Sequence, residues 1–115
     1  MMTALALLSS ADQLLGQTVG VWPRPAALLL RLSLEHGLRE YFQRVRPELN
    51  KCTMLEQMLC LEAYAGSGVA RQCAILWSGL SQACHYHAYE LSPTPGELGR
   101  WRGEVAAVLR LLGTS

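Results

Sequence analysis

The sequence predicts an all-α protein: an up-and-down four-helix bundle with an additional short N-terminal helix. In four segments apolar residues recur at three- and four-residue steps, the period of a helix with one buried face. Helix-start signals and Gly or Pro breakers separate these segments. No segment alternates apolar and polar residues as a strand does. Short connections favour antiparallel neighbours.

The chain has 115 residues, of which half are hydrophobic and 17% are charged, and its net charge is +1. These values suit one globular domain over residues 1–115, with an N-terminal helix and connection in 1–21 and a four-helix core in 22–112. They exclude a disordered chain and a global charge that attracts nucleic acid or membrane. Nine arginines and one lysine indicate a bacterial, high-GC source.

The N-terminal segment is apolar but is too short to span a bilayer, and no basic residue precedes it. We therefore expect no secretion signal and no membrane association, and we place the protein in the cytoplasm. In that reducing compartment the four cysteines are expected to be free thiols, buried as small apolar residues.

Residues 3–15 are expected to form the short first helix, laid across the bundle, and the proline-containing stretch 17–25 an irregular connection. Pro25 suits the first turn of a long helix that ends before Pro47. Its N-terminal half is apolar on nearly all sides and is expected to be the more deeply buried half. The apolar stripe of this helix is Leu30, Leu34, Leu38, Tyr41 or Phe42, and Val45.

Thr53 and Glu56 form a capping box that opens a short helix, expected to present Leu55, Met58 and Leu59 and to end at Gly66. A third helix begins at residue 67 or 68 and is expected to end near residue 89. Its stripe is Val69, Cys73, Leu76, Trp77, Leu80 and Cys84.

Thr94 and Glu97 form a second capping box, with Pro95 at the first helical position. The last helix is expected to end at Gly113. Its apolar face is Leu98, Trp101, Val105, Val108, Leu109 and Leu112.

Residues 81–90 concentrate the chemistry of the chain at the end of the third helix. Two histidines, two tyrosines, a thiol and a carboxylate fall within these ten residues, and a helix C-terminus favours a protonated imidazole. A general acid/base site is one interpretation, in which His85 or His87 moves protons in phosphodiester cleavage with Tyr86 or Glu90 in support. These four residues are the candidate catalytic residues.

Two other interpretations of this segment stay open. In the structural one, the histidines and Glu90 only stabilise the helix end and the following turn. In the metal one, Cys84 and His87 bind zinc together with His36 and Glu35. The usual metal-ligand spacings, a phosphate-binding glycine loop and a Gly-x-Ser-x-Gly elbow are absent from the sequence, so we assign no metal ligands and no cofactor.

Three stretches resemble the HEPN superfamily of bacterial helical bundles. Residues 24–38, with Arg-Leu-Ser-Leu-Glu at 31–35, resemble the first long helix of that group. Residues 76–87 resemble its histidine-bearing helix end, and the capped last helix follows in the expected order. The resemblance implies a dimer, and in active members a metal-independent RNase with an arginine four to six residues before the histidine. Residues 78–82 contain no arginine.

The leading functional prediction is therefore a small interaction module, non-catalytic and homodimeric, that acts with a nucleic-acid-processing or defence partner. RNA is a candidate ligand. The first alternative is a metal-independent RNase that uses His85 or His87. The second is a small metal-binding protein.

Overall fold

The computed structural model describes residues 3–15, 23–85 and 93–113 of the chain. These residues form helices and contain no strand, as the all-α prediction requires. In chain order the elements are α1 (Ala4–Leu15), α2 (Pro23–Val45), the short 3-10 helix η1 (Pro47–Lys51), α3 (Met54–Ala65), α4 (Ser67–Cys84) and α5 (Pro95–Leu111).

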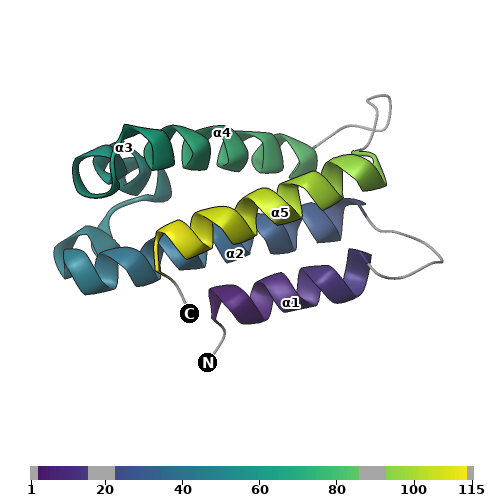
Figure 1. Cartoon of the computed structure of the whole chain (residues 1–115), viewed down its shortest axis with the longest axis horizontal. Coiled ribbons are helices and arrows are strands. Elements are labelled where there is room, and N and C mark those ends of the chain that lie inside the picture. Colours follow the sequence, from purple (N-terminus) through teal and green to yellow (C-terminus); the bar gives the residue numbers. More distant parts are fainter. Residues whose placement is uncertain (1–2, 16–22, 86–92, 114–115) are drawn as a thin grey trace.

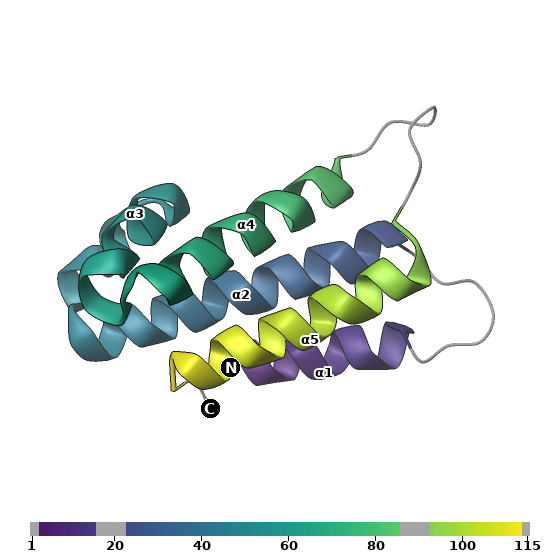
Figure 2. The ribbon, with the colours of Figure 1, turned by 45° about the horizontal axis from the view of Figure 1, so that its top comes forward.

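Helix α2 is the centre of the fold, since α1, α4 and α5 all pack against it. Figures 1 and 2 show these four helices running along the length of the molecule, each opposite in direction to the one before it. Helix α3 lies beside the start of α4 at one end. The N-terminal helix was expected to lie across the others. This expectation is wrong: α1 lies lengthwise against α2 and α5.

Three contacts of α1 explain its position. The Ser33 hydroxyl of α2 is fully buried and donates a hydrogen bond of 2.7 Å to the carbonyl of Ala4. The Ala4 N–H donates to Oε1 of Glu40 at 3.0 Å. At the other end of α1, the Arg102 guanidinium donates two hydrogen bonds, of 2.6 and 2.9 Å, to the carboxylate of Asp12. Polar partners on α2 and α5 therefore hold both ends of α1.

The core follows the stripe predicted for α2 as far as Phe42, whereas Val45, its last predicted member, is 42% exposed. Its largest fully buried side chains are Leu30, Leu34, Leu38 and Phe42 from α2, with Leu61, Leu76, Leu80, Leu98, Leu109 and Leu112 from the other helices. The helix begins at Pro23, two residues before the expected start. Its first turns are not buried on all sides, since the Leu28 side chain keeps 40% of its surface exposed.

Two further expectations about helices are wrong. Helix α4 ends at Cys84 and His85 has left the helical conformation, so the helix stops short of residue 89. After Cys84 the sequence continues with histidine and tyrosine, which favour a helix less than the leucines and alanines before them. In α3 the buried side chains are Gln57, Met58 and Leu61, whereas Leu55 and Leu59 are 59% and 74% exposed.

Both predicted capping boxes are present. Thr53 Oγ1 accepts the N–H of Glu56 at 3.2 Å, and Glu56 Oε1 accepts the N–H of Thr53 at 2.8 Å. The same pair of bonds joins Thr94 and Glu97, at 3.1 and 3.2 Å. These bonds satisfy amide groups that have no partner within the first turn of a helix.

We expect Thr53→Ala to lower the free energy of unfolding by about 1 kcal/mol, because it removes the cap of α3. Bonds from Thr53 lower the pKa of Glu56 below its usual 4.5, so this carboxylate stabilises the fold above that pH and less as the pH falls. The backbone N–H of residue 53 makes the larger contribution to the lowered pKa of Glu56, and alanine keeps it, so in the variant this pKa should rise only part of the way. Urea unfolding and an NMR titration measure the two effects, and an unchanged free energy of unfolding would contradict the assigned cap.

Candidate functional site

Of the four predicted catalytic residues, the structure describes His85; Tyr86, His87 and Glu90 lie outside the described residues. His85 directly follows α4 and its side chain is exposed. Its backbone N–H donates to the carbonyl of Gln82 at 3.1 Å, which closes the last turn. The imidazole is therefore held at a helix end, as the sequence predicts.

His85 and Cys84 line an open pocket between the end of α4 and the start of α2. The pocket has a volume of about 320 Å³, and its other lining residues are Arg24, Pro25, Leu28 and Arg31. Two guanidinium groups and an imidazole thus share a pocket whose remaining walls are mostly apolar. Because α2 and α4 run in opposite directions, the start of one lies beside the end of the other.

A short chain of contacts holds Arg31 beside this pocket. Trp77 Nε1 donates to Oε2 of Glu35 at 2.8 Å, and the same oxygen lies 3.6 Å from Nε of Arg31. That separation is an ion pair but exceeds hydrogen-bonding distance, so the buried Nε has no hydrogen-bond partner among the residues that the structure describes. The side chains of Arg31 and Glu35 are only 21% and 13% exposed, so water screens the pair weakly.

Burial raises the pKa of the Cys84 thiol, while the nearby positive charges of Arg31 and Arg24 act in the opposite direction. Burial also raises the pKa of Cys73 in the core, to about 12. Both thiols are therefore protonated at neutral pH, and a protonated thiol is a weak nucleophile. All four cysteines are free, as expected. The pocket can attract an anion through its arginines, and His85 places an imidazole beside them.

Among the described residues, those proposed for zinc form no metal-binding group. Within the described part of the chain, no three His, Cys, Asp or Glu residues are grouped so that they could hold a metal ion. Glu35 instead accepts the Trp77 indole N–H, and His87 lies outside the described residues.

None of the helices that the structure describes has the length and apolar character needed to cross a membrane.

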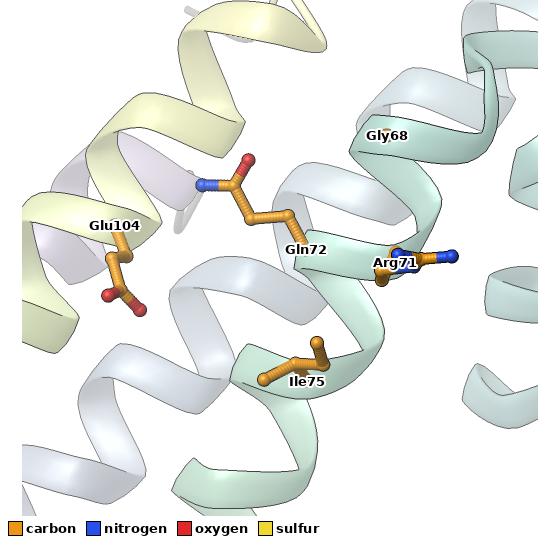
Figure 3. A pocket seen from close by; sticks show the side chains of 5 residues that line it. All are labelled: Gly68, Arg71, Gln72, Ile75 and Glu104. Carbon is orange, nitrogen blue, oxygen red and sulfur yellow. The ribbon is translucent and has the colours of Figure 1, made fainter.

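A second feature is an exposed face across α3, α4 and α5, which we call the α3–α4 face. It consists of Leu55, Leu59, Glu62, Arg71, Ala74, Ile75 and Glu104. It contains two hollows: one of about 270 Å³ between α3 and α4, and one of about 340 Å³ between α4 and α5. Arg71 lines both. In Figure 3, Gln72 points from α4 toward α5, while Arg71 points to the opposite side of α4.

Sequence reasoning missed Arg24 and Arg31 as neighbours of His85. It searched for an arginine on the same helix, whereas the structure supplies two from α2. The available signal was topological, since antiparallel neighbours place the start of α2 next to the end of α4. It also missed the exposure of Leu59 and Ile75, which sequence periodicity alone does not show.

No family model matches the chain, and neither does any curated protein or solved structure.

Proposed function

We propose that the protein is a small, non-catalytic helical interaction module of the HEPN-like kind. It forms a homodimer in the bacterial cytoplasm and acts with a nucleic-acid-processing or defence partner. The α3–α4 face supports this proposal most directly. Leu55, Leu59 and Ile75 expose 59%, 74% and 67% of their surface there. Exposed apolar groups that gather on one side of a monomeric protein mark interaction sites more often than isolated ones do.

The four lengthwise helices are α1, α2, α4 and α5, so α1 takes the place predicted for the short helix α3. Support for the HEPN-like fold comes from the histidine-bearing end of α4, which precedes the capped last helix. The test of the dimer is light scattering over a concentration series. The expected mass is twice 12.7 kDa, and a monomer throughout the micromolar range would contradict the proposal.

A metal-independent RNase is the second candidate, and one observation favours it. Arg24 and Arg31 line the same pocket as His85, so the pocket holds the cationic side chains that residues 78–82 lack. A guanidinium group can stabilise the charge that develops on a phosphate oxygen, while a histidine moves the proton. Tyr86, His87 and Glu90 remain candidates for supporting roles in this reaction.

Incubation of the purified protein with total RNA in EDTA separates the two functions. The interaction module leaves the RNA intact. The RNase cleaves it, and the RNase hypothesis predicts that both the His85→Ala/His87→Ala variant and Arg31→Gln lose cleavage. Arg39→Gln, an exposed change on the same helix, is the matched control and should keep full cleavage. Full cleavage by the double histidine variant would rule the RNase out.

A further inference from the structure

We propose that two copies of the chain pair through the α3–α4 face around a two-fold axis. The partner that this face fits is thus a second copy of the protein. This inference rests on the proposed dimer and assigns its interface.

The apolar part of the α3–α4 face forms a continuous surface across two helices. Leu55 and Leu59 are one helical turn apart on α3, so they lie on the same side of that helix. Leu59 and Ala74 line one hollow, and Ile75, next to Ala74 in the chain, lines the other. Homodimer interfaces have a core of this composition, with polar groups around it.

The charged part of the face complements itself. Arg71 lies between two carboxylates, Glu62 of α3 in one hollow and Glu104 of α5 in the other. Among the described residues, Arg71 and Glu62 form no ion pair, and Glu104 has only the exposed Arg100, at 3.8 Å. In a two-fold dimer the same face of each copy meets the other copy. A face with one cation beside an unpaired carboxylate can therefore form two equivalent ion pairs across the axis. We assign the pair to Arg71 and the partner subunit's Glu62.

The size of the molecule allows such an interface. The described fold measures 42 × 28 × 23 Å, and α4 runs along the longest dimension. A stable interface needs about 800 Å² from each partner, and one broad side of a fold of this size can supply that area.

The test is the dimer dissociation constant, measured by sedimentation with single and paired substitutions. Leu59→Glu and Ile75→Glu should each raise the constant at least tenfold, because they place a charge in the apolar centre of the interface. Val45→Glu, at the end of α2, is the matched control: its side chain is similarly accessible, at 42% exposed, and lies outside the face, so its constant should be unchanged.

Charge reversal tests the assigned pair. Arg71→Glu and Glu62→Arg should each weaken the dimer at least tenfold, and the double variant should recover most of the wild-type affinity. Unchanged thermal unfolding of each variant under monomeric conditions shows that the fold is intact. If the wild-type protein is a dimer and none of these substitutions changes its dissociation constant, the assigned interface is wrong but the dimer stands. A wild-type monomer would overturn the proposed dimer itself.

Discussion

Replacing Phe42 by alanine is expected to lower the free energy of unfolding by about 3–5 kcal/mol, the cost of removing a large buried aromatic side chain. Phe42 has no exposed surface. Its ring meets those of Tyr41 and Tyr64 edge to face, with centroids 5.3 and 5.7 Å apart. Tyr64 belongs to α3, so Phe42 packs α2 against the helix that carries half of the α3–α4 face. The variant thus loses both core volume and an inter-helix contact.

Urea unfolding followed by circular dichroism measures this change. A small domain has about 5–15 kcal/mol of stability, so the variant should unfold at a much lower urea concentration. Val45→Ala, three residues along the same helix at a 42% exposed position, is the control, with an expected loss below about 1 kcal/mol. Equal losses from the two variants would show that the end of α2 is not packed as described.

Local signals in the sequence predicted the parts of the fold that local interactions determine. The pairs Thr53 with Glu56 and Thr94 with Glu97 are three residues apart, and each capping box forms within its own first turn. The stripe of α2 is confirmed from Leu30 to Phe42, because a long helix at the centre of a bundle buries one side. It is wrong for Val45 at the end of the helix, which is 42% exposed.

Features set by contacts between distant segments could not be predicted in the same way. Helix α3 has apolar residues on several sides, and the sequence does not show which side meets α4. The structure buries Gln57 and exposes Leu59, because η1 covers the side of α3 that carries the glutamine. Sequence reasoning likewise identified His85 but missed its arginine neighbours, since the contact between α2 and α4 joins residues more than fifty positions apart.

Arg44 and Arg102 show the same limit on the protein surface. An arginine on the polar side of a helix is expected to be solvated unless a neighbouring helix supplies a partner. The Arg44 guanidinium in fact donates to the Leu112 carbonyl at the end of α5, and Arg102 binds Asp12 of α1. Each arginine therefore joins two helices, a role that depends on which helices are neighbours.

Replacing Gln57 by leucine is expected to lower the free energy of unfolding by about 1–3 kcal/mol, although leucine is apolar and similar in size. Gln57 is fully buried, and its Nε2 donates to the carbonyls of Leu49 and Cys52 at 3.0 and 3.4 Å. Leucine offers no donor, so the Cys52 carbonyl loses the bond from Nε2, and the Leu49 carbonyl keeps only the Cys52 N–H, at 3.1 Å. The loss of a buried hydrogen bond outweighs the gain in apolar surface when its partner is left unsatisfied.

Gln82→Leu on the exposed side of α4 is the matched control, because the same chemical change there breaks no side-chain bond in the described structure. Its free energy of unfolding should differ from the wild-type value by no more than about 0.5 kcal/mol. The Gln57 bonds fix η1 against the first turn of α3, so their loss should also raise hydrogen exchange at the amides of residues 49–57 before the rest of the chain opens. A Gln57→Leu protein as stable as the wild type would mean that the Leu49 and Cys52 carbonyls do not depend on this side chain. The side of α3 that faces the core would then be set by Met58 and Leu61 alone.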